Sequence, residues 1–331
     1  MTSASVRHGI VAGIDGSASA VNAARWAASA AKRFDEPLRL THVLPGQPES
    51  GGGTNVTDEE MFDHHLRVEG AKLLDEAEDA IRDDHTDVTV ERGLVTGTPA
   101  TTLVELSKSA RIVALGQAGT SEMQSVFLGS DTIRVVNRAH CPVAVFRGTG
   151  EHAVADTRPI VVGVDGSKLS ELAVAHAFEF AAFLGAPLVA VHTWNEHASL
   201  GGYSEARRFV DWGPYEQHEH ALLSECLAGW TEKYPDVEVT RSVQRSGPMK
   251  ALLEHSAEAQ LVVVGSHGRS PFMASIVGST SQSLIHHAQC PVLVCREAEL
   301  VSVLPDPTSE RTALSAPSGG RKCRSLKQEW G

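Results

Sequence analysis

Residues 160–182 read IVVGVDGSKLSELAVAHAFEFAA, and residues 10–31 read IVAGIDGSASAVNAARWAASAA. Each stretch opens with a short apolar run, continues through Asp-Gly-Ser, and then places apolar residues at helical spacing. This pattern predicts a buried strand that is followed at once by a helix. Because it occurs twice at an offset of 150 residues, the sequence indicates the duplication of a whole domain.

The duplication continues along the chain. Pro37 recurs as Pro187 at the offset of 150, and further on the offset becomes 149. There the stretch CPVAV at 141–145 recurs as CPVLV at 290–294. Only one residue is lost between the copies, which is typical of a duplicated domain rather than of a short-period repeat.

These offsets define the expected domains. We expect one domain in residues 1–150 and a second in residues 151–297, with a polar linker at 148–159 between them. Residues 298–331 are rich in Pro, Ser and Gly and have no periodic apolar face. Such a composition predicts a disordered tail.

The second repeat alternates strand-like and helix-like segments. Strands are expected at 159–165, 187–194, 237–243, 260–265 and 291–295, and helices at 170–185, 215–234, 249–258 and 281–288. Gly185 is expected to end the first of these helices. Short, continuously apolar strands that alternate with helices predict a parallel sheet covered on both faces. The predicted fold class is therefore α/β, with two doubly wound, five-stranded parallel-sheet domains of Rossmann-like type in tandem.

The composition excludes several classes of protein. A formal net charge of −12 argues against a nucleic-acid binder. No apolar run approaches the roughly 18 residues of a membrane span, and the start of the chain lacks a secretory signal. The five cysteines have no metal-site or disulfide spacing, and no Walker loop or nucleophile elbow occurs. We expect a soluble cytoplasmic protein that binds neither membrane nor nucleic acid.

A glycine-rich stretch follows the expected fourth strand of each repeat. Residues 263–281 read VVGSHGRSPFMASIVGSTS, and the first repeat keeps the same glycine intervals. The matching positions are Gly265, Gly268, Gly278 and Ser279 in the second repeat, and Gly116, Gly119, Gly129 and Ser130 in the first. Glycines let a ligand approach the main chain and can adopt positive φ, and the free N–H groups of a following helix attract phosphate. Turn geometry and helix capping alone would also explain the spacing, so both interpretations stay open.

Other side chains near these loops could contribute to a site. Asp165 follows the first strand of its repeat, and ligands of open parallel sheets bind where such loops face each other. Its carboxylate could hold a ribose hydroxyl, a base amine, or a magnesium ion through water. Ser279 is expected to cap the last helix and donate to phosphate, and Ser281 lies further along the same helix. His267, inside the loop, could contact phosphate.

With these motifs the sequence resembles the universal stress protein family in its tandem two-domain form. The resemblance covers about residues 6–147 and 157–296. ATP-binding members carry Gly, two residues, Gly, nine residues, and then Gly-Ser or Gly-Thr, and both glycine-rich stretches fit this pattern. Asp-Gly-Ser after the first strand and Cys-Pro-Val before the fifth also look like the family.

The resemblance implies that the ligand is ATP, with or without Mg²⁺. Base and ribose would lie by Asp165 and Thr193, and the phosphates by Gly268, Gly278 and Ser279. The full expected set in the second repeat is Asp165, Thr193, Gly265, His267, Gly268, Arg269, Gly278, Ser279, Thr280 and Ser281. In the first repeat it is Asp15, Val43, Gly116, Gly119, Gly129 and Ser130.

The first repeat departs from this pattern. Asp131 follows Ser130, where the second repeat has Thr280, and the first loop lacks an equivalent of Arg269. A carboxylate near a phosphate site repels the ligand unless magnesium intervenes. We therefore expect weaker nucleotide binding in the first repeat.

The resemblance favours a non-catalytic, ATP-binding regulator of the stress response, whose occupancy changes a surface read by an unidentified protein partner. A slow ATPase or a self-phosphorylating enzyme is one alternative, for which Arg269 is the only cationic candidate. A structural module that binds nothing is another. The resemblance also implies that the fifth strands, at 142–146 and 291–295, pair edge to edge within one chain, and a homodimer is possible.

Overall fold

The computed structural model describes six stretches of the chain. At residues 56–59 and 128–130 it describes only the backbone. The stretches are 8–46, 56–117, 128–147, 157–195, 211–268 and 277–296. Contacts divide them into two units. The first unit holds the described residues up to 147 together with Pro291–Arg296, and the second holds those from 157 to Cys290.

The first unit is an α/β sheet that alternates strands and helices. Its elements are β1 (Ile10–Gly13), α1 (Ala18–Phe34), β2 (Leu38–Pro45), α2 (Val56–Arg82), β3 (Val90–Gly97), α3 (Pro99–Leu106), β4 (Ile112–Gln117), α4 (Leu128–Arg138), β5 (Val143–Arg147) and β10 (Val292–Cys295). The strand order is β3-β2-β1-β4-β5-β10, and every pairing among the first five strands is parallel.

The second unit repeats this alternation. It consists of β6 (Ile160–Val164), α5 (Lys168–Leu184), β7 (Leu188–Thr193), α7 (Gly213–Lys233), β8 (Val239–Gln244), α8 (Pro248–Ser256), β9 (Leu261–Gly265) and α9 (Ser279–His287). The strand order is β9-β6-β7-β8, and all pairings are parallel. The predicted α/β class with tandem, doubly wound parallel sheets is confirmed.

The two units use the same strand register. Ile10 pairs with Leu38 in the first unit, and Ile160 pairs with Leu188 in the second. The pairings of β1 with β4 and of β6 with β9 likewise match at the offsets read from the sequence. The duplication therefore preserves the sheet as well as the sequence.

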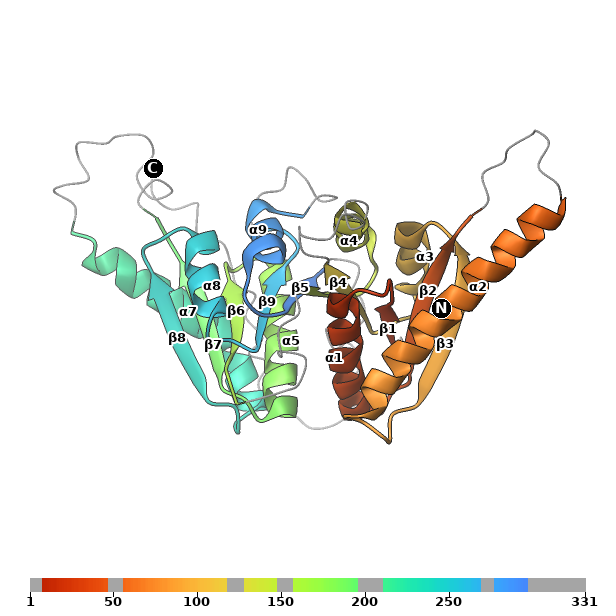
Figure 1. The fold of residues 1–331 in the computed structure, drawn as a ribbon. Coiled ribbons are helices and arrows are strands. Elements are labelled where there is room, and N and C mark those ends of the chain that lie inside the picture. Colours follow the sequence, from red (N-terminus) through yellow and green to blue (C-terminus); the bar gives the residue numbers. More distant parts are fainter. Residues whose placement is uncertain are drawn as a thin grey trace, which may run out of the picture. The chain divides into compact units, whose positions relative to one another are not determined.

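Helices cover both faces of each sheet. In the first unit α1 and α2 pack together on one face, and α3 and α4 pack together on the other (Figure 1). In the second unit α5 and α7 share one face, and α8 and α9 share the other. Strands covered in this way are buried on both faces, and every residue of β4 is buried.

The helix ends agree with local sequence signals. Helix α5 ends at Leu184, and Gly185 follows in the left-handed conformation with φ 61°, as predicted. Ser17 and Ser167 begin α1 and α5 by accepting a hydrogen bond from a backbone N–H of the first turn. The Asp-Gly-Ser stretch thus marks the start of a helix in both repeats.

The last strand of the second repeat belongs to the first unit. Strand β10 pairs antiparallel with β5, with Val292 opposite Val145 and Leu293 opposite Ala144. All four of these side chains are buried. The pairing of the two fifth strands within one chain, implied by the family resemblance, is confirmed.

Within the described stretches, no helix combines the length and the apolar character needed to cross a membrane.

Candidate functional site

The carboxyl ends of three strands meet at one edge of the second unit. Strand β6 lies between β7 and β9, and the chain leaves it toward β7 before it returns on the other side as β9. In open parallel sheets such a reversal leaves a crevice beyond the strand ends, where ligands bind. The loops after β6, β7 and β9 therefore border a candidate site.

A cavity of about 840 Å³ occupies this edge. Its lining includes the predicted residues Asp165, Thr193, Gly265, His267, Gly268, Gly278, Ser279, Thr280 and Ser281. The volume lies within the range of small-molecule pockets, about 300–1,000 Å³. The structure thus brings these residues together around one space, whereas Arg269 lies outside the described residues.

Asp165 is held in place by the start of α5. Its Oδ1 accepts a hydrogen bond of 2.9 Å from the backbone N–H of Ser167. A Cβ built on Gly268 would lie 2.7 Å from Asp165 Oδ2, so the glycine allows the loop after β9 to approach the carboxylate. Since the position lies beside the positive end of the α5 dipole, the negative charge is stabilised there.

Gly265 has a packing role that the sequence did not indicate. Neither Gly265 nor Gly268 has a positive φ, so left-handed backbone does not explain them. A Cβ on Gly265 would lie 2.9 Å from Leu169 Cβ, and one on Gly116 would overlap the backbone nitrogen of Ala20. In both repeats this glycine lets the first turn of a helix pack against the strand, although Gly265 also lines the cavity.

The start of α9 forms another wall. Gly278 is the N-cap, and its N–H donates 2.7 Å to the carbonyl oxygen of Ser266. No described side chain caps the helix, so the prediction that Ser279 caps it is wrong. The first N–H groups of a helix have no partner within the helix, and they carry partial positive charge. Because Ser279 and Thr280 line the cavity, this positive end borders it.

Ser281 fixes the loop instead of extending toward a ligand. Its hydroxyl is buried and donates 2.7 Å to the carbonyl oxygen of Gly265. Thr132 makes the matching bond to Gly116 at 3.4 Å in the first unit. This bond ties the last helix of each repeat to the end of the preceding strand.

The opposite wall was not predicted. Trp194, Tyr215 and Glu219 line the cavity, and so does His192 from the strand beneath them. The rings of Trp194 and Trp212 lie 5.7 Å apart, and those of Trp212 and Tyr215 lie 5.5 Å apart. The sequence signal was the i, i+4 spacing of Tyr215 and Glu219, which places both on one face of α7.

A buried histidine links α7 to β7. His192 Nδ1 lies 2.7 Å from the carbonyl oxygen of Val164, and Nε2 lies 2.8 Å from Glu219 Oε2. The imidazole is almost completely buried, and the carboxylate is partly exposed. A carbonyl oxygen only accepts, so the Nδ1 hydrogen is assigned to the bond with Val164.

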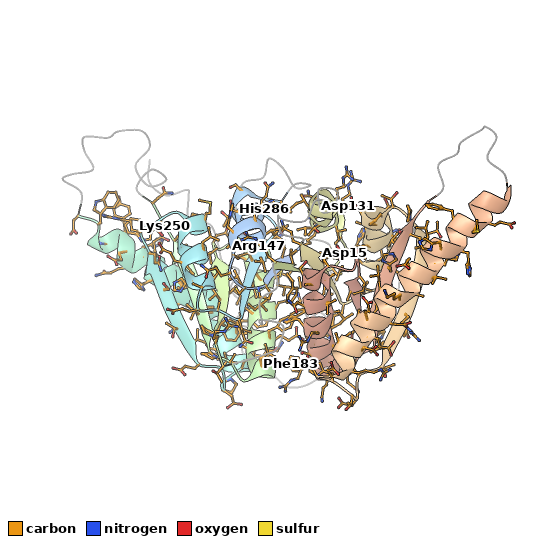
Figure 2. The ribbon with its side chains drawn as sticks, in the orientation of Figure 1. Asp15, Asp131, Arg147, Phe183, Lys250 and His286 are labelled. Atoms are coloured by element: carbon orange, nitrogen blue, oxygen red, sulfur yellow. The ribbon has the colours of Figure 1, made fainter. Side chains whose placement is uncertain are left out.

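The first unit keeps only part of this arrangement. Asp15 accepts bonds from the N–H and the hydroxyl of Ser17, at 2.9 and 2.6 Å. Asp131 pairs with Arg134 at 3.0 Å in the first turn of α4, and Figure 2 shows Asp15 and Asp131 at the same end of this unit. Val43 lies near the end of β2, paired with Val95.

The glycine positions of the first loop are described less fully. Gly129 and Ser130 lie in the first turn of α4, where the backbone alone is described. Gly119 lies outside the described residues. Across the described stretches, no group of three His, Cys, Asp or Glu side chains is arranged to hold a metal ion.

Comparison with known proteins agrees with this architecture. The sequence profile described as "Universal stress protein family" matches residues 7–147 and 156–296. A universal stress protein of Mycobacterium tuberculosis H37Rv is 38% identical over 305 residues, which cover 88% of this chain and 98% of the relative. One from Mycolicibacterium smegmatis is 36% identical over 303 residues, covering 89% and 99%.

A solved structure shows a similar fold. The crystal structure of a universal stress protein from Archaeoglobus fulgidus DSM 4304 superposes with a TM-score of 0.62 at 18% identity, covering 87% of this chain and 96% of that one. The two family segments together span most of the sequence and coincide with the two repeats. The chain belongs to the universal stress protein family.

Proposed function

We propose that this protein is a stress-response regulator that binds ATP in the cavity of its second unit. The observation that carries the proposal is the convergence of Asp165, the glycine loop and the start of α9 on one cavity of about 840 Å³. The cavity lies at the strand-order reversal, which is the usual ligand site of such sheets.

The cavity has two chemically different ends, which suggest an orientation for ATP. Backbone N–H groups at the start of α9 suit phosphate oxygens, because they attract an anion without a lysine. The aromatic wall of Trp194 and Tyr215 suits the nucleoside. In the proposed pose Asp165 and Thr193 lie by the ribose and base, and His267 lies by the phosphates.

The lining favours binding over catalysis. Among the described residues that line the cavity, none is lysine or arginine. Phosphoryl transfer relies on cationic groups that neutralise the charge of the transition state. We therefore propose that nucleotide occupancy itself is the signal, and that it shifts α9 and a surface read by a protein partner. Hydrogen exchange of α9 with and without ATP tests this step, and unchanged protection contradicts it.

The ligand can be identified directly. Native mass spectrometry of the protein as purified, followed by denaturation and identification of the released molecule, is expected to yield an adenine nucleotide. Titration of nucleotide-free protein with ATP, with and without Mg²⁺, then gives the affinity. Absence of any nucleotide together with no heat on titration overturns the proposal. Sustained phosphate release at high protein concentration contradicts the non-catalytic role.

The assembly and location are also proposals. We propose a cytoplasmic protein that can form a homodimer. Sedimentation at several concentrations tests the dimer, and a single monomeric species at all concentrations contradicts it. Cell fractionation tests the location, and recovery outside the cytoplasmic fraction contradicts it.

A further inference from the structure

One charged side chain on the cavity wall is not explained by phosphate binding. Glu219 extends from α7 into the lining and is held by His192 at 2.8 Å. Its partner imidazole is almost completely buried, which fixes the direction of the carboxylate. The carboxyl oxygen that faces away from His192 can only accept hydrogen bonds, so this wall does not suit the phosphate end of a ligand, which also only accepts.

The hydrogen-bond geometry determines what Glu219 can offer a ligand. Because His192 Nδ1–H donates to Val164, only Nε2 faces the carboxyl group, and a bond of 2.8 Å there requires one proton between Nε2 and Oε2. That proton belongs either to an imidazolium or to a carboxylic acid. In both forms the other oxygen, Oε1, carries no hydrogen and acts only as an acceptor, and such an oxygen accepts more than one bond.

The surroundings of Glu219 suit the nucleoside end of a ligand. Tyr215 lies one turn earlier on α7 and lines the same wall, and its ring packs against Trp212. A wall that combines aromatic rings with a fixed acceptor is typical of a site that orients a flat, partly polar group. The phosphate-binding features lie at the start of α9 and in the glycine loop instead.

The first unit provides an internal comparison. His42 repeats the bond of His192, with Nδ1 2.7 Å from the carbonyl oxygen of Ile14. A Cβ on Gly70 of α2 would lie 2.9 Å from His42 Cδ2. In the first unit the helix therefore places a glycine, and not a glutamate, against this imidazole. The carboxylate is thus a feature of the second unit that the shared fold does not require.

We propose that Glu219, oriented by the positioning residue His192, accepts a hydrogen bond from a donor on the nucleoside and thereby sets which nucleotides the cavity accepts. The donor is either the amino group of the base or a ribose hydroxyl, and the inference rests on the proposed nucleotide site. A site built to bond a donor discriminates against an analogue that lacks it, because the analogue forms one hydrogen bond fewer to the carboxyl group.

The test compares ATP with analogues that each lack one donor. Calorimetry uses ATP, purine riboside triphosphate without the 6-amino group, 2′-deoxy-ATP and 3′-deoxy-ATP. The wild type is expected to bind at least one analogue about tenfold to hundredfold more weakly than ATP. This is the effect of losing one hydrogen bond to a charged group. The analogue whose loss of affinity disappears in Glu219→Leu identifies the donor that Glu219 bonds. Equal binding of all four overturns the inference.

Variants connect that loss to Glu219. In Glu219→Leu, ATP and the discriminated analogue are expected to bind alike. In Glu219→Gln the amide NH₂ can donate to neutral His192 Nε2 and leave its oxygen as an acceptor, so discrimination is expected to persist. Glu225→Leu removes an exposed charge from the same helix and serves as the control. Undiminished discrimination in Glu219→Leu contradicts the inference.

The outcomes separate the two proposals. If the wild type binds none of the four nucleotides, the nucleotide site itself fails. If it binds ATP without discriminating, only the role of Glu219 fails. Circular dichroism checks that each variant is folded. Should Glu219→Leu unfold, the wild-type series and Glu219→Gln still decide, since loss of discrimination in the Gln variant contradicts the predicted rescue.

Discussion

The glycines of the loop after β9 have separate functions at the scale of single residues. Gly265 provides room for Leu169 of α5, and Gly268 provides room for the Asp165 carboxylate. The sequence pattern predicts both positions but leaves open whether each serves the ligand or the packing of the fold. The two roles can be told apart only from the distance between α5 and β9, and the spacing of residues in the sequence does not give this distance.

Gly265→Ala is therefore expected to reduce stability. The added methyl would lie 2.9 Å from Leu169 Cβ, and overpacking of this kind costs about 1–3 kcal/mol. Gly229→Ala is the control, because its methyl meets nothing within 4 Å and alanine favours a helix interior. Urea unfolding should show a loss for the first variant and a gain for the second. A gain for both would contradict the packing role.

Cys290 is expected to be inert in the folded protein. Burial in an apolar environment is the main reason that the pKa of its thiol rises to about 12, so almost no thiolate exists near neutral pH. Mass spectrometry after brief treatment with iodoacetamide should find Cys290 unmodified, and alkylation should follow after unfolding in urea. Rapid modification of Cys290 in native buffer would contradict the burial.

The aromatic wall and Glu219 were not predicted. Asp165 and the glycines share their intervals with the first repeat, so the duplication made them visible. Tyr215 and Glu219 have no such match, and they reach the cavity only because α7 packs across β7. A contact between a helix and the strand that precedes it in the chain depends on helix placement, which local patterns do not specify.

At the scale of elements, the last helices of the two repeats begin differently. The N-terminus of α9 has no described side-chain cap, whereas α4 carries Asp131 in its first turn, paired with Arg134. An acidic residue at this position stabilises a helix, because it interacts favourably with the dipole. The same charge competes with an anionic ligand for the helix N-terminus.

Thr280→Asp should therefore reproduce the first-repeat feature in the second unit. We expect ATP affinity to fall at least about tenfold, because a carboxylate would lie at the phosphate end of the cavity. Gln282→Asp is the matched control, since it adds the same charge to α9 at an exposed position. Calorimetry with ATP measures both variants. Equal losses would show a general effect of charge rather than a phosphate site.

His85, which follows α2, is expected to make the stability of the first unit depend on pH. Desolvation is the main cause that lowers the pKa of His85 below its ordinary value of 6.5; Lys32 and Arg25 act in the same direction, and Asp84 and Asp87 oppose them. The unfolded chain then binds a proton more readily than the native one, so the stability of the native state falls as pH drops below about 6.5 toward the lowered native pKa.

This dependence is measured by urea unfolding at pH 7.5 and 5.5. The wild type should lose more stability between the two values than His85→Gln, which cannot titrate. Because His85 is partly exposed, the difference in stability loss between the two proteins is expected to be small. The prediction concerns only its sign, which follows from the direction of the pKa shift. Identical losses in both proteins would contradict the assigned direction.

At the scale of the whole molecule, most of the fold follows from the duplicated pattern. Strand and helix order, parallel pairing and the shared register all agree with the sequence. The pairing of β5 with β10 was expected only from the family resemblance, and the structure shows it through Val145 and Val292. Apolar patterning identifies a strand but not its partner, because both neighbours of a buried strand present the same kind of surface.

Removal of β10 should expose the edge of β5. A chain that ends at Cys290 lacks the strand that pairs with Val143 and Ala144, and an open apolar edge promotes association. Light scattering after size exclusion should show higher oligomers or aggregates for this truncation. A chain that ends at residue 297 keeps β10 and is the control. The same mass and melting temperature for both truncations would contradict a structural role for β10.

The central claim is that the second unit contains the main nucleotide site. It is tested most directly by ATP titration of two double variants, Gly268→Ala/Gly278→Ala and Gly119→Ala/Gly129→Ala. The first pair places methyl groups 2.7 Å from Asp165 Oδ2 and 3.3 Å from His267 Cα, so most of the measured affinity should be lost. The second pair should leave the tighter binding event intact. Equal losses from both pairs would contradict the claim.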